Sequence, residues 1–278
     1  MKQKKAYVIG SNAKKSLSPT IFNYWFNKHN VGAKYFHKEI KEKLFENQIL
    51  KTLGERNLCG LNITIPYKEK IIPHLDKIDT HSLKIGAVNC VTKNKNTLLG
   101  TNTDWLGFQT SLNWFIKKNK LKSKKNTAIV LGYGGSAKAI IYSLTKSKYK
   151  KVKVFNRSFN KIKKGKKVHP FKLKDLSKHL YTADIIINTI PATKTKQQHM
   201  FDMLDAVHKF GKLESIGYDV VYNQETNFLN NFKPSHRIHG TLMLIHQAAP
   251  CFKKWFKVDP KIDNKIIKKL LQEAKKKQ

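Results

Sequence analysis

The chain reads Ala128-Ile129-Val130-Leu131-Gly132-Tyr133-Gly134-Gly135-Ser136-Ala137 at the point that decides its fold. Four apolar residues in a row predict a buried β-strand, and apolar positions at helical spacing predict a helix over residues 138–144. A β-branched and aromatic run at 151–155 predicts the next strand. A strand, a glycine turn, a helix and a strand in this order are typical of a layered α/β fold with a parallel sheet.

The glycine pattern fits G-x-G-x-x-G/A, with Gly132, Gly134 and Ala137 in the three defined places. The first glycine allows a tight turn, the second lets the backbone approach a pyrophosphate, and a small third residue lets the helix pack on the strand. The helix start offers free N–H groups and a positive dipole end to phosphates. A glycine triplet alone can be an ordinary tight turn, but this context predicts a dinucleotide-binding loop formed by Gly132, Gly134, Gly135, Ser136 and Ala137.

The end of the 151–155 strand indicates which dinucleotide is bound. NAD-dependent enzymes usually carry Asp or Glu there to hold a ribose hydroxyl, whereas this chain continues with Asn156, Arg157 and Ser158. Arg157 can stack on the adenine or bind a 2′-phosphate, Ser158 can donate a hydrogen bond, and Lys161 lies one helical turn further. The segment therefore predicts NADP, with an ordinary arginine at a strand end as the alternative.

The same alternation of strands and helices extends along the chain, and a polar, basic connection at 117–125 separates two α/β series. We predict further strands at 6–9, 33–40, 60–65, 87–92, 97–99, 183–188 and 216–222. Ser18 followed by Pro19 predicts an N-cap and the first helical position. Other helices are expected at 44–53, from about Asp104 to 115, and at 242–256 and 262–271.

The net charge of +37 raises the possibility of a nucleic-acid partner. Two features make specific nucleic-acid binding an unfavoured hypothesis. The lysines are spread through every segment, and the 55 basic residues include only three arginines, the side chain that reads bases and phosphates in bidentate fashion: Arg56, Arg157 and Arg237. A positive field would still attract anionic ligands at low salt.

The cysteines and the hydropathy indicate the class of protein. Cys59, Cys90 and Cys251 form no CxxC pair, so we expect neither a metal site nor a disulfide framework, and a reducing cytoplasm fits. No run of about 18 apolar residues predicts a transmembrane helix. The basic start of the chain leads into a short strand and not into a signal-peptide apolar region.

Two further segments carry groups suited to proton transfer. Asn62-Ile63-Thr64-Ile65-Pro66-Tyr67-Lys68 stands at a predicted strand end, where α/β sheets place ligands, and Asn102-Thr103-Asp104 opens a predicted helix. A lysine and an aspartate that meet in a cleft could share a proton and hold it near a substrate hydroxyl. Lys68 could instead be a solvated lysine, and Asp104 a helix first-turn acid.

In these motifs the chain resembles the shikimate dehydrogenases from end to end. The matching segments occur in the family's order: Ser16-Leu17-Ser18-Pro19, Asn62 to Lys68, Ala87-Val88-Asn89, Asn102-Thr103-Asp104 with Gly107-Phe108, the glycine loop, Asn156-Arg157-Ser158, Asp219-Val220-Val221-Tyr222, and Gly240 to Ala249. The resemblance implies reversible reduction of 3-dehydroshikimate to shikimate by NADPH.

The resemblance also implies a two-domain α/β fold. Residues 1–103, completed by the C-terminal helices of 241–278, would form a substrate-binding catalytic domain with a mainly parallel sheet. Residues 104–240 would form a Rossmann domain that binds NADP. The active enzyme would be a monomer or a homodimer.

The roles of individual residues follow from the same resemblance. Lys68 and Asp104 would be the catalytic pair. The substrate carboxylate would be bound by Ser16, Ser18, Thr64 and Tyr222, and the ring hydroxyls by Asn89, Asp104 and Gln247. Besides the glycine loop and Asn156, Arg157, Ser158 and Lys161, NADP would contact Thr189, Val220 and Gly240.

The chain departs from the family pattern at Tyr133, Cys90 and Ile190. None of these positions supplies a catalytic group, so the departures bear on affinity and not on the reaction. Two rival hypotheses stay open. One is a quinate/shikimate dehydrogenase that uses NAD, and the other is a basic nucleic-acid-binding protein on an inactive enzyme fold.

Overall fold

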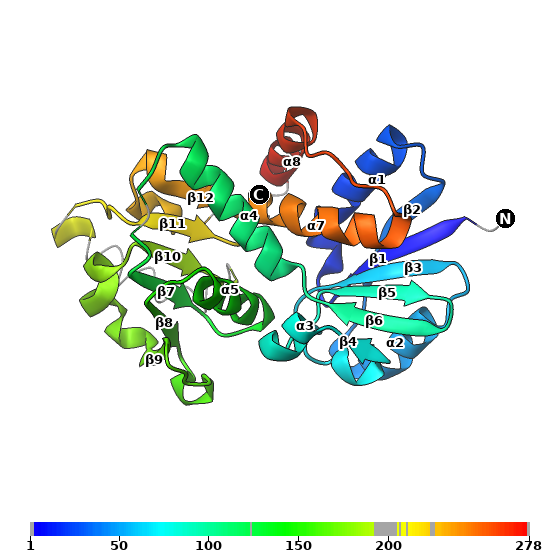
Figure 1. The fold of residues 1–278 in the computed structure, drawn as a ribbon, viewed down its shortest axis with the longest axis horizontal. Helices are drawn as coiled ribbons and strands as arrows, with labels where there is room; N and C mark the ends of the chain where they lie inside the picture. Colours follow the sequence, from blue (N-terminus) through cyan, green and yellow to red (C-terminus); the bar gives the residue numbers. More distant parts are fainter. Residues whose placement is uncertain are drawn as a thin grey trace. The chain divides into compact units, whose positions relative to one another are not determined.

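A computed structural model gives the fold (Figure 1) and describes residues 3–122, 124–191, 205, 207–209, 211–222 and 226–276. The chain divides into two compact units. The first comprises Met1–Gly107 with Leu244–Lys277, and the second comprises Phe108–Met243. Two helices therefore each contribute residues to both units, namely α4 (Asp104–Lys118) and α7 (Gly240–Phe256).

The first unit is built on a mixed sheet with the strand order β2-β1-β3-β5-β6-β4. Parallel pairing joins β1 to β2, β1 to β3 and β4 to β6, whereas β3–β5 and β5–β6 pair antiparallel. The strands are β1 (Lys4–Gly10), β2 (Ala33–Glu39), β3 (Leu58–Ile63), β4 (Lys77–Ile78), β5 (Cys90–Asn94) and β6 (Thr97–Thr101). The central strands β1 and β3 are largely buried, as expected for strands covered on both faces.

Aromatic side chains hold α1 (Ser18–Lys28) and α7 against this sheet. Phe22 of α1 stacks on Tyr35 of β2, with 4.2 Å between the ring centroids, and on Trp255 of α7 at 5.3 Å. Phe252 approaches the same ring at 5.8 Å. The unit also contains α2 (Phe45–Leu53), α3 (Thr80–Ile85) and α8 (Asn264–Lys276).

The second unit is built on an all-parallel sheet with the order β12-β11-β10-β7-β8-β9. Its strands are β7 (Thr127–Leu131), β8 (Lys151–Asn156), β9 (Val168–Lys172), β10 (Ile185–Asn188), β11 (Ile216–Asp219) and β12 (Arg237–His239). Counted from β9, this is the 3-2-1-4-5-6 order of the Rossmann fold, in which ligands bind where the strand order reverses. That point lies between β7 and β10, and the glycine loop directly follows β7.

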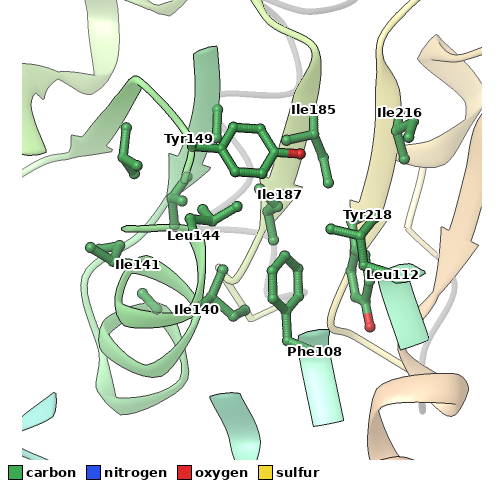
Figure 2. Close-up of a cluster of buried hydrophobic side chains, with 14 of the residues drawn as sticks. Phe108, Leu112, Ile140, Ile141, Leu144, Tyr149, Ile185, Ile187, Ile216 and Tyr218 are labelled. Carbon is green, nitrogen blue, oxygen red and sulfur yellow. The ribbon is translucent and has the colours of Figure 1, made fainter. Parts of the chain in front are cut away.

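An apolar core packs α4 and α5 (Gly135–Lys146) on one face of this sheet (Figure 2). Phe108 of α4 and Ile140 of α5 lie among the same buried side chains as Ile187 and Tyr218 of the strands. All five residues of β7 are buried. The reason is that a second cluster forms on the other face from side chains that include Ile129, Phe155, Leu176, Phe228 and Phe232.

Short elements at the sheet edges account for most differences from the sequence prediction. The strands β4, β9 and β12 and the helix α3 were not predicted. β9 contains Pro170, which lacks a ladder donor and is tolerated at an edge. The predicted strand 87–92 begins only at Cys90, and the predicted strand 216–222 ends at Asp219, so the residues beside both strands are loops.

A buried carboxylate joins the carboxyl ends of β10 and β11. Asp219 Oδ1 accepts hydrogen bonds from Asn188 Nδ2 at 3.0 Å and from the Val221 N–H at 3.0 Å, and Oδ2 accepts one from the Thr226 hydroxyl. Asp219 is only 2% exposed. Burial raises the pKa of Asp219 from its usual 3.8 to about 6, although the three hydrogen bonds lower it.

We predict that a side chain larger than that of glycine at position 60, in β3, destabilises the fold. A Cβ at this position would lie 2.2 Å from the Cε2 and Nε1 atoms of Trp255. Gly60→Ala should therefore lower the free energy of unfolding by about 1–3 kcal/mol. Gly32→Ala is the control, since a Cβ there meets nothing within 4 Å. Urea unfolding of both variants measures the effect, and equal stabilities would contradict the prediction.

We also predict a pH-dependent stability that arises from Asp219. Its folded-state pKa lies above its ordinary value, so its contribution to stability is complete below pH 3.8 and is lost as the pH rises through about 6. Relative to Asp219→Asn, which does not titrate, the wild-type chain should lose about 2 kcal/mol of unfolding free energy between about pH 4 and about pH 7. Denaturant unfolding at both pH values tests this, and a pH-independent difference between the two proteins would refute it.

Candidate active site

Lys68 and Asp104 form a buried ion pair in the first unit. Lys68 Nζ lies 2.5 Å from Asp104 Oδ2, and the two residues are 8% and 5% exposed. Asp104 is the first residue of α4, and its N–H donates to Asn102 Oδ1 at 3.0 Å. Thirty-six positions separate the two residues along the chain, so the fold and not the local sequence brings them together.

The segment before Lys68 is anchored by its neighbour Tyr67. The Tyr67 ring stacks on Phe45 with 4.3 Å between centroids, and its hydroxyl donates to the Ile40 carbonyl at 2.5 Å. The Lys68 carbonyl in turn accepts the Val88 N–H at 2.8 Å. These contacts fix the backbone from which the ammonium group reaches Asp104.

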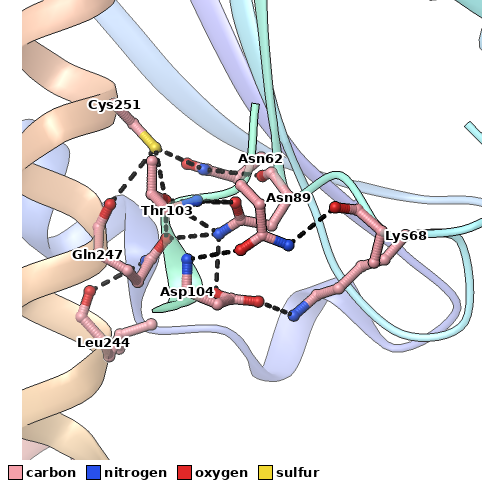
Figure 3. Close-up of polar contacts among 10 residues, drawn as sticks. Asn62, Lys68, Asn89, Thr103, Asp104, Leu244, Gln247 and Cys251 are labelled. Carbon is pink, nitrogen blue, oxygen red and sulfur yellow. Dashed lines mark hydrogen bonds and ion pairs between the residues drawn. The ribbon is translucent and has the colours of Figure 1, made fainter. Parts of the chain in front are cut away.

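Asn89 orients the other carboxylate oxygen of Asp104 (Figure 3). Its Nδ2 donates to Asp104 Oδ1 at 2.8 Å and lies 3.1 Å from Gln247 Oε1 and 3.0 Å from Thr103 Oγ1. Its Oδ1 accepts the Thr103 N–H at 2.6 Å. Four of the residues predicted for the site are thus in one hydrogen-bonded group: Lys68, Asn89, Asp104 and Gln247.

The group continues into residues that the sequence analysis did not assign. Cys251 Sγ accepts from Asn62 Nδ2 at 3.2 Å and lies 3.4 Å from Thr103 Oγ1. Asn62 Oδ1 accepts the Tyr35 hydroxyl at 2.7 Å. Burial raises the pKa of the Cys251 thiol well above its usual range, so this thiol stays protonated. Asn62 and Thr103 stand inside the predicted motifs, whereas no sequence signal marked Tyr35 or Cys251.

Two serines lie together at the start of α1. The Ser16 hydroxyl donates to Ser18 Oγ at 3.1 Å and accepts the Ser18 N–H at 3.2 Å. His37 Nε2 donates to the Ser16 carbonyl at 2.9 Å. The prediction that Ser18 is the N-cap is wrong, because the helix begins at Ser18 and Leu17 is the cap residue. The Ser16 hydroxyl supplies the acceptor for the first helical N–H instead.

Thr64 follows β3 and is hydrogen-bonded through its backbone to β1. Its N–H donates to the Ile9 carbonyl at 2.8 Å. The packing here is tight, because a Cβ at Gly10 would lie 2.4 Å from Thr64 Cγ2. Thr64 and the serines belong to the first unit, whereas Tyr222 belongs to the second.

The glycine loop of the second unit has the geometry that its sequence predicts. Gly132 has φ +101°, and a Cβ there would lie 2.5 Å from Thr189 Oγ1. A Cβ at Gly134 would meet nothing within 4 Å, so the backbone there faces open space. α5 begins at Gly135 and includes Ser136 and the buried Ala137. The open approach to Gly134 and the helix start fit a pyrophosphate.

Polar and basic residues follow the end of β8, where the 2′-phosphate of NADP was predicted to bind. Asn156 is the last residue of the strand, and Arg157, Ser158 and Lys161 are exposed beyond it. Tyr133 packs back on this segment, because its hydroxyl accepts the Lys163 N–H at 3.0 Å. No carboxylate stands in the segment from Asn156 to Lys161, which suits a 2′-phosphate.

The other predicted cofactor contacts lie on the same edge of the second sheet. The Thr189 hydroxyl donates to the Leu131 carbonyl at 2.6 Å. Gly240, the first residue of α7, packs so closely that a Cβ would lie 2.4 Å from the Val220 carbonyl oxygen. Ile190 contacts the glycine loop as well, 3.3 Å from the position of a Cβ on Gly132.

The described part of the chain contains no group of three or more His, Cys, Asp or Glu side chains that could hold a metal ion. None of its helices is both long and apolar enough to cross a membrane. The three cysteines are free thiols.

Comparisons with known proteins agree with these motifs. Residues 8–91 match the family described as the shikimate dehydrogenase substrate binding domain, and residues 115–209 match shikimate / quinate 5-dehydrogenase. The chain is 34% identical to an NADP(+) shikimate dehydrogenase of Pelagibacter ubique over 94% of this chain and 96% of that protein. It is also 34% identical to one of Caldicellulosiruptor saccharolyticus, with 99% of both covered.

Solved structures share the whole fold. The shikimate dehydrogenase of Aquifex aeolicus aligns with a TM-score of 0.82 at 27% identity over 97% of this chain and 98% of that one. The shikimate 5-dehydrogenase of Listeria monocytogenes, solved in complex with shikimate and NAD, aligns with a TM-score of 0.77 at 25% identity over 97% of this chain and 96% of that one. With relatives of this identity over nearly its full length, the chain belongs to the shikimate dehydrogenase family of NADP-dependent oxidoreductases.

Proposed function

We propose that this chain catalyses the reversible reduction of 3-dehydroshikimate to shikimate with NADPH, a step in the synthesis of aromatic amino acids. The observation that carries the proposal is the buried pair of Lys68 and Asp104, at 2.5 Å, inside a hydrogen-bonded group of polar side chains. The relatives named as NADP(+) shikimate dehydrogenases support the same reaction.

Lys68 is the proposed proton donor. NADPH, when bound, supplies the hydride to the carbonyl carbon. As negative charge develops on the substrate oxygen, the Lys68 ammonium donates a proton to it, and in the reverse direction the neutral amine takes that proton back. Asp104 Oδ2 holds Nζ in place, and its Oδ1 is fixed by Asn89. The carboxylate therefore orients the ammonium before the reaction.

The ring hydroxyls of the substrate are proposed to face Asp104, Asn89 and Gln247. Gln247 Nε2 donates to the Leu244 carbonyl at 2.9 Å, and this bond leaves the second N–H for a ligand. The amide N–H groups of Asn89 donate to acceptors within the protein. Asn89 thus binds a hydroxyl only by exchanging one of these partners, and its main contribution is to orient Asp104 and Gln247.

The carboxylate of the substrate is proposed to accept hydrogen bonds from hydroxyl groups. The proposed donors are Ser16, Ser18, Thr64 and Tyr222. The two serine hydroxyls already share a hydrogen bond at 3.1 Å. A carboxylate oxygen can accept from both, and hydrogen bonds to a charged acceptor are the stronger ones.

NADP is the proposed cofactor of the second unit. The pyrophosphate would lie on the glycine loop from Gly132 to Ala137, and the 2′-phosphate beside Asn156, Arg157, Ser158 and Lys161. Thr189, Val220 and Gly240 would line the remaining part of the cofactor. Accordingly, the unit of residues 1–107 with 244–277 would bind the substrate, and residues 108–243 would bind NADP.

The cellular location of the enzyme is proposed from its cysteines. Cys59, Cys90 and Cys251 are free, which suits a reducing cytoplasm. We propose that the enzyme works there as a monomer or a homodimer, and sedimentation velocity distinguishes the two.

One assay tests the proposed function against its rivals. Nicotinamide absorbance is followed with shikimate or quinate, each with NADP or NAD. Turnover is expected with shikimate and NADP. Preference for quinate with NAD would favour the quinate/shikimate dehydrogenase, and no turnover in any combination would defeat the enzyme hypothesis. DNA binding that survives physiological salt would favour the nucleic-acid hypothesis.

For Lys68 we predict a loss in the chemical step. Lys68→Ala should lower kcat by about 10²–10⁴-fold with near-normal KM for shikimate, the usual scale of general acid–base catalysis. Lys70→Ala is a matched control, since Lys70 lies two positions away in an exposed pair with Glu42 and should keep wild-type kcat. A loss confined to KM in Lys68→Ala would show that Lys68 only binds substrate.

For Arg157 we predict a change in cofactor preference. Arg157→Ala should raise KM for NADP by about tenfold and leave KM for NAD unchanged, because only NADP carries the 2′-phosphate. Arg56→Ala, which removes an exposed arginine from the other unit, serves as the control for net charge. Equal effects on NADP and NAD would contradict the role of Arg157 in binding the 2′-phosphate.

A further inference from the structure

The proposed reaction makes no use of the buried carboxylate of Asp219. Asp219 stands in the segment Asp219-Val220-Val221-Tyr222, of which the proposal uses only Val220 and Tyr222. It is 2% exposed, at the carboxyl edge of the second sheet, where β10 and β11 end. A carboxylate is costly to bury, so its retention among hydrogen-bond donors requires an explanation in terms of what it holds.

One oxygen of Asp219 reaches the segment after β10. Oδ1 accepts from Asn188 Nδ2 at 3.0 Å, and Asn188 Oδ1 accepts the Ile190 N–H at 3.1 Å. Asn188 is itself 2% exposed. The next residue, Thr189, lies against Gly132 of the glycine loop. The carboxylate therefore selects the orientation of the amide that fixes the 189–191 segment.

The same carboxylate also fixes the segment after β11. Oδ1 accepts the Val221 N–H at 3.0 Å, and Oδ2 accepts the Thr226 hydroxyl. These two donors stand on either side of Tyr222 in the sequence. The Val220 carbonyl packs directly on Gly240 at the start of α7, where a Cβ would lie 2.4 Å away. Two backbone segments proposed to line NADP, after β10 and after β11, are thus held by one side chain.

We propose that Asp219 is a positioning residue that holds the 189–191 and 220–222 segments in the arrangement that binds NADP. It acts through Asn188 and the Val221 N–H and not by contact with the cofactor. The inference rests on the proposed function only for the identity of the dinucleotide. Geometry and not charge is the essential contribution, since an amide could make the same three hydrogen bonds if the Thr226 hydroxyl accepts instead of donating.

Titration calorimetry of the full chain with NADP tests this inference without catalysis. Asp219→Ala should raise Kd by about tenfold, because it leaves buried donors unpaired and frees both segments. Asp219→Asn should stay within about threefold of wild type. The matched control is Asp184→Ala. Asp184 likewise accepts two backbone N–H groups, from Asn126 at 2.7 Å and Thr127 at 2.8 Å, but before β10 instead of after it.

Kinetics provide a second measurement on the same variants. In Asp219→Ala, KM for NADP should rise while kcat at saturation stays near wild type. If Asp219→Ala does not give folded protein, Asn188→Ala is used in its place. It removes only the connection from Asp219 through Asn188 to the Ile190 N–H, and it should likewise raise the Kd for NADP.

Three results would overturn the positioning role. An unchanged Kd in Asp219→Ala, or in Asn188→Ala if that variant replaces it, is the first. An equal loss in Asp184→Ala is the second, and would indicate general destabilisation. A loss in Asp219→Asn as large as in Asp219→Ala is the third, and would indicate charge. A wild-type chain that binds NADP but does not oxidise shikimate would defeat the proposed function and leave this test valid.

Discussion

A buried ion pair imposes the main constraint on the first unit. Removing both charges of Lys68 and Asp104 from water costs several kcal/mol per ion, and this is offset only when the remaining lone pairs and protons find partners. The structure meets this demand with Asn89, whose amide bonds the second oxygen of Asp104 and also contacts Gln247. The polar residues around the pair are therefore a condition for its burial.

The fold satisfies this constraint by drawing on distant segments. Lys68 follows β3, Asn89 precedes β5, Asp104 opens α4, and Gln247 lies in α7 near the other end of the chain. Packing of aromatic rings between α1, β2 and α7 holds the last of these helices on the sheet. Apolar packing thus fixes the backbone positions, and hydrogen bonds then fix the side-chain orientations.

The sequence predicted what depends on local pattern. The buried run of β7, the turn at Gly132 and the helix after it are local features, and the structure contains all three. Edge strands such as β9 were not predicted, because they bury too few side chains to show the alternation of apolar and polar residues that marks a strand. Tyr35 and Cys251 were missed for a different reason. Their contacts with Asn62 arise only from tertiary packing, and neither residue stands inside one of the motifs.

The two buried carboxylates show how local surroundings outweigh net charge. Asp104 has an ammonium group at 2.5 Å, whereas the hydrogen-bond partners described for Asp219 are all neutral. In a chain of charge +37, a general positive field would lower the pKa of Asp219, yet burial raises it to about 6. The largest cause is the desolvation of the buried charge, and the hydrogen bonds from Thr226, Val221 and Asn188 only partly oppose it. The pKa of this buried carboxyl group therefore depends on its immediate surroundings and not on the net charge of the chain.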